Sequence, residues 1–159
     1  MRRITIAWTV ISIVFSLPLA NGFAQEGHSG LGFGLRAGLG LDPDQFALGG
    51  QFSLGKKLGI ARVVPSIDLG FGDNVTTVAF NTDFLLRLIV EDANFGFYGG
   101  AGPTVALFDF NRGGSDWKVG LSVVAGTQLP IFRNRATNLE ARFSIGNIPD
   151  FRLLFVVVF

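Results

Sequence analysis

The chain has 159 residues, of which 48% are hydrophobic and only 16% are charged, and it contains no cysteine. This length predicts a single domain, while the charged fraction is below the about 25–35% that the surface of a soluble domain usually carries. With 13 basic and 12 acidic side chains there is no basic field to attract nucleic acid, and without cysteine there are no disulfides or thiolate metal sites.

The N-terminal segment is typical of a secretory signal peptide. Arg2 and Arg3 precede a mostly apolar run over 4–19, and small residues follow before Gln25. The apolar run is shorter than the about 20 residues that a transmembrane helix needs, and no stop-transfer charge follows it. We therefore expect residues 1–24 to be a cleaved signal peptide and residues 25–159 to be the mature domain. Without Arg2 and Arg3, 11 basic residues face 12 acidic ones, a net charge of −1.

Beyond this segment the hydrophobic pattern has a period of two. In 30–41, GLGFGLRAGLGL, apolar side chains alternate with glycine or Arg36, which predicts a β-strand. The glycines are not a phosphate-binding loop, because no strand precedes them and no helix follows. The same alternation returns between clusters of turn-forming residues and predicts seven further strands. Their expected ranges are 46–55, 60–72, 76–88, 95–108, 117–129, 137–146 and 151–159.

The two faces of these eight strands differ in polarity. One face is rich in Phe, Leu and Val, too many to fit the interior of an eight-stranded barrel, which is only just wide enough for ordinary side chains. Slipping a strand by one residue would turn its charges towards lipid, at roughly 2–4 kcal/mol for Lys or Arg near the midplane. We therefore expect the apolar face to contact lipid. The charges on the opposite face are Arg36, Arg62, Asp68, Asp83, Arg87, Lys118, Glu140, Arg142 and Arg152.

A sheet that contacts lipid must close, because open edges leave backbone groups unsatisfied in hydrocarbon. The predicted fold is therefore all-β, an eight-stranded antiparallel up-and-down transmembrane β-barrel. An even number of strands places both termini on the same side of the membrane, the periplasmic side in bacterial barrels of this kind.

The C-terminal segment, FRLLFVVVF, ends on an aromatic residue after apolar residues at alternate positions. In this the chain resembles the small outer-membrane β-barrel proteins of the OmpA/OmpX type. The resemblance implies a location in the outer membrane of a Gram-negative bacterium, with outer-membrane lipids and lipopolysaccharide as surroundings. We expect the protein to be a monomer. The resemblance also implies that the barrel-assembly machinery recognises the terminal pattern during insertion. That pattern consists of Phe151, Leu153, Phe155, Val157 and Phe159.

The enclosed charges leave two functions open. They must pair or reach water. One reading is a salt-bridged plug, with Glu140 and Arg142 next to Arg152 and Arg36, and a second group of Asp68, Asp83 and Arg87. In this case the protein has a structural or envelope-associated role. The alternative is a narrow porin-like channel for small solutes or ions, because inward glycines leave room for water.

The joints at the end away from the termini are rich in aspartate. One hypothesis is a cation-binding rim that bridges to lipopolysaccharide phosphates, since hard cations prefer carboxylate oxygens. The other, which we favour, is that aspartate is a good turn residue and stays hydrated. The residues concerned are Asp42, Asp44, Asp73, Asp109, Asp116 and Asp150.

No residue set predicts catalysis or a cofactor. The only histidine, His28, precedes the first strand, so a Ser-His-Asp arrangement has no base in place. One histidine without cysteine also makes a dedicated transition-metal site improbable. We expect no enzyme, no cofactor and no metal. A surface binding module is the third candidate function, and the short loops speak against it.

Overall fold

The computed structural model describes residues 32–54, 56–88, 96–111, 113–132, 135–148 and 151–159. The expected signal peptide, residues 1–24, and His28 lie outside these ranges, as does Asp150 of the aspartate-rich joints. Within them, no helix is long and apolar enough to cross a bilayer.

The described residues form mostly β-structure, and the alternating pattern accounts for each long strand. The strands are β1 (Gly32–Leu41), β2 (Gln45–Ser53), β3 (Lys56–Leu58), β4 (Ala61–Phe71), β5 (Val75–Leu88), β6 (Phe97–Phe110), β7 (Ser115–Phe132), β8 (Arg135–Gly146) and β9 (Phe151–Val158).

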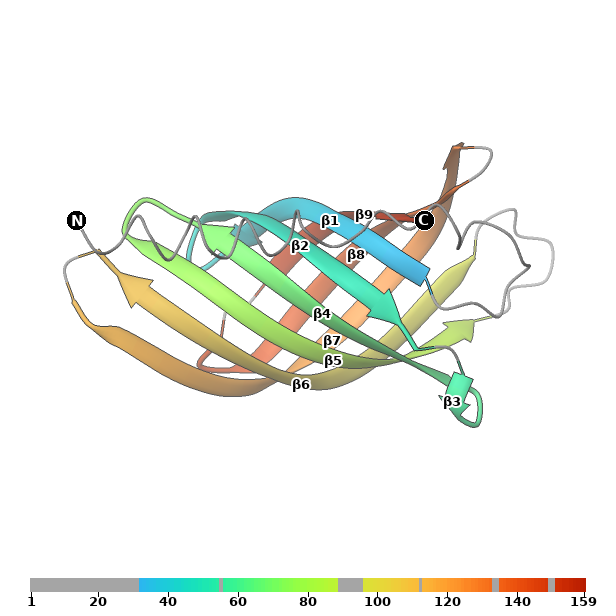
Figure 1. Ribbon diagram of the computed structural model, residues 1–159, viewed down its shortest axis with the longest axis horizontal. Coiled ribbons are helices and arrows are strands. Elements are labelled where there is room, and N and C mark those ends of the chain that lie inside the picture. Colours follow the sequence, from blue (N-terminus) through green and yellow to red (C-terminus); the bar gives the residue numbers. More distant parts are fainter. Residues whose placement is uncertain (1–31, 55, 89–95, 112, 133–134, 149–150) are drawn as a thin grey trace.

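Eight of these strands close into an antiparallel barrel, as predicted (Figure 1). The eight are β1, β2 and β4 to β9, and β3 lies outside the closed set. Within this set each strand pairs with the next, so that β2 pairs with β4, and β1 pairs with β9 to close the barrel. Beyond the last pair of that seam, the amide N–H of Phe159 donates to the carbonyl of Phe33, with 2.7 Å between nitrogen and oxygen. The terminal residue therefore takes part in closing the barrel.

Most strand ends differ from the prediction by one or two residues, and two differences are larger. The segment after β2, expected to be a turn, forms the short strand β3, which pairs with the start of β4. Strand β7 runs from Ser115 to Phe132, longer at both ends than the predicted 117–129. The reason is cross-strand pairing, with Ser115 opposite Asp109 and Phe132 opposite Arg135, which continues beyond the apolar alternation that the prediction followed.

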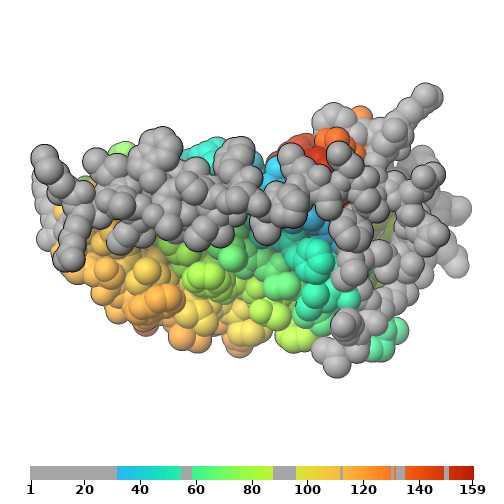
Figure 2. Space-filling model, in the orientation of Figure 1, coloured from blue at the N-terminus to red at the C-terminus, as the bar shows by residue number. Residues whose placement is uncertain are grey.

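The outer face of the barrel is apolar along all eight strands. Side chains at alternate positions of each strand are exposed there, and in Figure 2 those of β5, β6 and β7 form a continuous outer surface. On β7, for example, Leu121 and Val123 are exposed, whereas Ser122 and Val124 between and beside them are buried. The expected orientation of the apolar face is confirmed. Among the exposed residues are Phe33, Leu39, Phe46, Ile67, Phe80, Phe84, Val105, Trp117, Leu139, Phe143 and Leu153.

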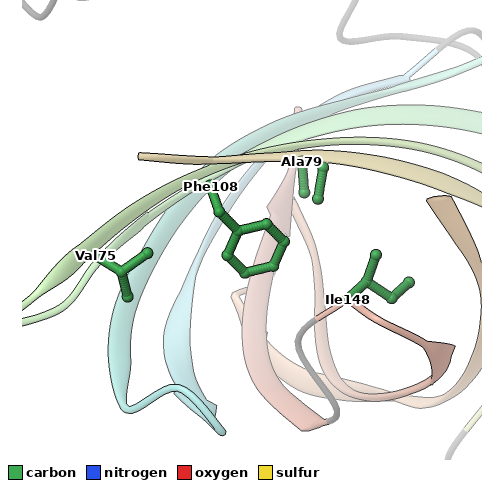
Figure 3. Packing of buried hydrophobic residues seen from close by; sticks show 5 residues of the cluster. Val75, Ala79, Phe108 and Ile148 are labelled. Carbon is green, nitrogen blue, oxygen red and sulfur yellow. The ribbon is translucent and has the colours of Figure 1, made fainter. Parts of the chain in front are cut away.

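Part of the lumen is also apolar, which the sequence analysis did not predict. Near the turns at the end away from the termini, Val75, Phe108 and Ile148 are buried together with Ala79 and Ala106 (Figure 3). The Lys118 ammonium lies 4.8 Å from the centroid of the Phe108 ring. A second apolar cluster inside the barrel combines Ala47 of β2 with inward residues of β9. The second cluster lies level with buried charges, since Leu154 pairs with Glu140 and Val156 pairs with Arg36 on the adjacent strands.

Candidate functional site

Six charged side chains are buried in the lumen, each with 3% or less of its surface exposed. Period-two alternation accounts for their position, because each lies one residue away from an exposed apolar side chain on its own strand. The six are Arg36 on β1, Asp68 on β4, Asp83 on β5, Glu140 and Arg142 on β8, and Arg152 on β9. We call this set the lumen network.

Arg142 has the best hydrogen-bond geometry in the lumen network. Its Nη1 and Nη2 atoms donate to the two carboxylate oxygens of Asp83, at 3.0 Å and 2.6 Å. The same Nη2 lies 3.5 Å from Oε1 of Glu140, and Nη2 of Arg36 donates to that oxygen as well. Glu140 is therefore held between two guanidinium groups. Two parallel bonds of the kind that join Arg142 to Asp83 are among the strongest polar contacts in proteins.

Asp68 is shared by two further cations. Its Oδ1 lies 3.6 Å from Nε of Arg36 and its Oδ2 lies 3.6 Å from Nη1 of Arg152, while Asn81 Nδ2 donates to Oδ2 at 2.9 Å. Both arginine contacts are ion pairs beyond hydrogen-bond distance. Nη2 of Arg152 is buried without a hydrogen-bond partner among the described residues. Arg152 is therefore the least firmly held of the three arginines.

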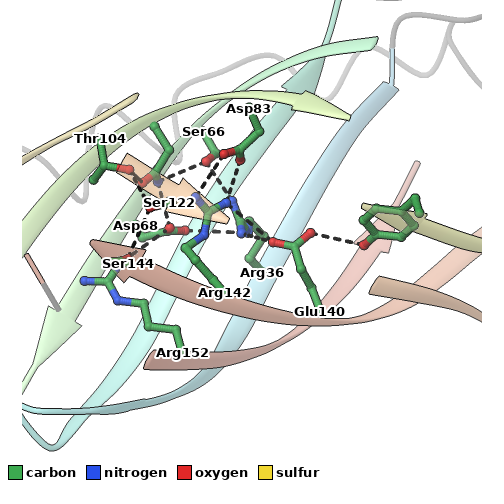
Figure 4. A network of polar contacts seen from close by, with 12 residues as sticks. Arg36, Ser66, Asp68, Asp83, Thr104, Ser122, Glu140, Arg142, Ser144 and Arg152 are labelled. Atoms are coloured by element: carbon green, nitrogen blue, oxygen red, sulfur yellow. Dashed lines mark hydrogen bonds and ion pairs between the residues drawn. The ribbon is translucent and has the colours of Figure 1, made fainter. Parts of the chain in front are cut away.

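Neutral side chains extend the lumen network around the barrel wall (Figure 4). Arg36 donates to Ser66 on β4 at 2.6 Å, and Tyr98 on β6 donates to Glu140 at 3.1 Å. A chain of hydrogen bonds continues from Asn81 on β5 through Thr104 and Ser122 to Ser144, at 2.8, 2.8 and 3.2 Å. The contacts join residues of β1, β4, β5, β6, β7, β8 and β9, which is every strand of the closed barrel except β2.

Glycine provides the space that two of these side chains occupy. A Cβ at Gly49 on β2 would collide with Oδ1 of Asp68, and a Cβ at Gly126 on β7 would collide with the ring of Tyr98. Any other residue at these positions would have to displace the carboxylate or the phenol. Strand β2 thus contributes to the network by leaving room for it.

The lumen network is balanced in charge, with three guanidinium groups against three carboxylates. Burying a charge is strongly unfavourable unless partners replace its hydration, and removing one partner of a buried pair costs about 3–5 kcal/mol. All six side chains are almost completely buried, so water reaches very little of their surface. What the arrangement can do is cross-link the barrel wall and fill its centre.

The other three predicted lumen charges lie outside this network. Arg62 is half-buried, Arg87 is exposed, and Lys118 lies over the Phe108 ring. The two expected groups are in fact one, because Asp83 contacts Arg142 and Asp68 contacts Arg36 and Arg152. The prediction grouped charges on adjacent strands. In the narrow lumen, however, Asp83 on β5 contacts Arg142 on β8 from across the barrel. The neutral members, such as Ser66 and Thr104, lie at inward-facing alternate positions like the charges, but they were not predicted to belong to the site.

The predicted aspartate rim does not assemble a cation site among the described residues. No group of three or more His, Asp or Glu side chains there is arranged to hold a metal ion. Asp42, Asp44, Asp73, Asp109 and Asp116 are exposed residues in or beside the turns. This arrangement is the one expected for hydrated turn residues.

The five residues of the expected assembly signal lie on or directly after β9 with their side chains on the outer face. Leu153, Phe155 and Phe159 are exposed, and Phe151 and Val157 are half-buried. The guanidinium of Arg135 lies 4.3 Å from the centroid of the Phe159 ring. Their recognition by the assembly machinery stays a prediction.

Comparison with known proteins supports the architecture and not a specific activity. No protein-family model and no curated protein matches the chain. Among solved structures, the N-terminal β-barrel domain of Pseudomonas aeruginosa OprF is similar, with 13% identity, a TM-score of 0.66, and coverage of 84% of this chain and 98% of that one. Neisserial surface protein A is similar with 11% identity, a TM-score of 0.58, and coverage of 80% and 94%. The chain has the fold of the small outer-membrane barrels. At these identities the likeness concerns the fold alone.

Proposed function

We propose that the protein is an integral β-barrel of the bacterial outer membrane whose lumen is closed by ion pairs, with a structural or envelope-associated role and no enzymatic activity. The observation that carries this proposal is the lumen network, because six charges buried to 3% exposure or less occupy the space that a pore would need. A pore lined by charges would leave them in contact with water.

The location is supported by the outer face and by the predicted export signal. Exposed Phe, Leu and Val side chains surround the barrel, and such a surface is stable in hydrocarbon and not in water. A tilted strand needs about 9–11 residues to span a bilayer, and most of the strands are at least this long. Cleavage of residues 1–24, insertion by the assembly machinery and contact with lipopolysaccharide belong to the same proposal.

A narrow channel for small solutes or ions is the second candidate. It is favoured by Arg152, whose Nη2 lacks a hydrogen-bond partner among the described residues. A guanidinium held only by a distant carboxylate is the part of the network that water would reach first.

Refolding of residues 25–159 into lipid, followed by a heat-modifiability gel and recording of conductance in planar bilayers, tests both candidates. The gel shift reports a folded barrel. The closed-lumen proposal expects no conductance steps from the parent protein and measurable steps from Glu140→Ala, since this change leaves Arg36 and Arg142 with fewer partners and opens space between them. Asp116→Ala, which removes an exposed carboxylate at the rim, is the matched control and should stay silent. Conductance in the parent would favour the channel.

A further inference from the structure

Two arginines lie at the end of the lumen beside β3 and do not belong to the lumen network (Figure 1). Arg62 lies near the start of β4, and Arg87 lies near the end of β5. Each continues the inward alternation of its strand, which also contains Asp68 on β4 and Asp83 on β5. Arg62 is half-buried and Arg87 is exposed, so both face the mouth of the lumen, where water reaches them.

The register between β4 and β5 makes these two positions neighbours. Arg62 pairs with Leu85, so Arg87 lies two residues along β5 from the position opposite Arg62. Asp68 and Asn81 are offset by the same step in the same direction, and their side chains are joined by a hydrogen bond of 2.9 Å. Inward side chains with this offset therefore lie beside each other on the lumen wall, and at the mouth both of them carry a positive charge.

Neither of these arginines has a partner of opposite charge among the described residues. The ion pairs there involve Arg36, Arg142 and Arg152, and no hydrogen bond or ion pair joins Arg62 or Arg87 to another side chain. Like charges at neighbouring positions on one face of a sheet destabilise it. An anion between the two guanidinium groups would remove this repulsion.

A buried hydroxyl without a hydrogen-bond partner lies next to Arg62. Ser53, at the end of β2, is 6% exposed, and its Oγ has no partner in the described part of the chain. Gln51 pairs with Ser66 on β4. Ser53 is two residues further along β2, so it is offset from Arg62 by the step that separates Arg62 from Arg87. Buried polar groups are nearly always hydrogen-bonded, so this hydroxyl indicates a ligand or a water at this point.

Gly96 and Gln128 continue the mouth on the other side of Arg87. A Cβ at Gly96 would lie 3.4 Å from Nη2 of Arg87 and 3.3 Å from Oε1 of Gln128, so both side chains extend over this glycine. The backbone amide of Gln128 donates to the carbonyl of Gly96 at 2.7 Å, which holds β7 against this point. Hydrogen-bonding side chains from β2, β4, β5 and β7 thus line the mouth.

We propose that Arg62 and Arg87, with Ser53 and Gln128, bind a small dissolved oxyanion of the phosphate type at this mouth. Phosphate offers enough acceptor oxygens to bond with both guanidinium groups and the hydroxyl at once, and arginine matches its geometry. The residues face the lumen and not the lipid, which favours a dissolved anion over a lipid headgroup. The inference goes beyond the proposed function, because it needs the barrel fold but neither a closed lumen nor a particular membrane.

Phosphorus NMR of inorganic phosphate tests this binding. Phosphate is titrated at constant ionic strength against residues 25–159 refolded in an uncharged detergent, and the broadening of its line gives the dissociation constant. Arg62→Gln and Arg87→Gln should each raise this constant about tenfold, the effect of losing one hydrogen bond between charged groups. Arg135→Gln is the matched control and should change it less than twofold. It removes the same charge at the same end, but from the outer face, where the guanidinium lies over the Phe159 ring.

Three results would overturn the inference while leaving the proposed function intact, provided that the heat-modifiability gel shows a folded barrel. The first is a phosphate line that does not broaden with the parent protein. The second is an equal effect of Arg135→Gln and Arg87→Gln, which would show attraction by net charge alone. The third is displacement of phosphate by phosphatidylglycerol added to the micelles, which would identify a lipid headgroup as the ligand.

Discussion

Leu153 and Leu154 are adjacent and chemically identical, yet the first is 42% exposed and the second 1%. Val123 and Val124 on β7 repeat the comparison, with 44% and 1%. The face on which a side chain lies therefore depends on its position in the alternation along the strand and not on its own hydrophobicity. The charged residues determine which alternate positions face the lumen, because Arg142, Arg152 and their partners have to be enclosed there.

The two faces differ in what they require of each residue. On the outer face most of the described side chains are apolar, and lipid can surround any apolar side chain there. In the lumen, each charge is stabilised by named partners, as Arg142 is by Asp83, and neighbouring glycines leave the space that the network fills. On the outer face, a substitution should therefore be tolerated as long as the new side chain is apolar. In the lumen, it should be tolerated only if the contacts of the original side chain are kept.

The largest effect is expected from Asp68→Asn. This change keeps the shape of the side chain but removes the carboxylate that Arg36 and Arg152 share, leaving three buried cations against two anions. We expect the free energy of unfolding, measured by urea titration in lipid vesicles, to fall by about 3–5 kcal/mol. Asp109→Asn at the exposed rim should change it by less than about 0.5 kcal/mol. Equal effects of the two would contradict the role of the lumen network.

A charge on the outer face tests the other side of the comparison. Val123→Arg, near the middle of β7, should lower the free energy of unfolding in lipid by about 2–4 kcal/mol, because the guanidinium would face hydrocarbon. Trp117→Arg, near the end of the same strand, should cost only about 0–1 kcal/mol. If the two positions tolerated arginine equally well in the same urea titration, the outer face would not be in contact with lipid along its length.

The space left by glycine gives a smaller effect. Gly126→Ala should displace the Tyr98 ring from Glu140 and lower the free energy of unfolding by about 1–3 kcal/mol, as is usual for overpacking. Gly114→Ala is the control, since a Cβ there would meet no atom within 4 Å. The same urea titration measures both variants, and an unaffected Gly126→Ala protein would show that the phenol can move freely.

The smallest effect is expected from Tyr98→Phe. The ring keeps its packing against Gly126, and only the hydrogen bond of 3.1 Å to Glu140 is lost. We expect a loss of about 1 kcal/mol in the free energy of unfolding. A loss as large as that of Asp68→Asn would mean that the phenol does more in the network than donate one hydrogen bond.

The alternation and turn clusters of the sequence predicted the barrel, its eight strands and the burial of six of the nine expected lumen charges. They did not predict which charges meet. Asp83 and Arg142 lie 59 residues apart on strands that are not neighbours, and their contact depends on how the strands tilt and how narrow the lumen is. The apolar cluster around Phe108 was also not predicted. Its residues face the lumen like the charges, but they are apolar, and the prediction identified the lumen-facing positions by their charge.

Methyl NMR of the protein in lipid nanodiscs, with labelled leucine and valine, tests the central claim most directly. The pairs Leu153 and Leu154, and Val123 and Val124, compare identical residue types at adjacent positions. We predict nuclear Overhauser contacts from the acyl chains of the lipid to the methyl groups of Leu153 and Val123, and none to those of Leu154 and Val124. Lipid contacts to Leu154 and Val124 in place of their neighbours would show that the faces are reversed and would contradict the account.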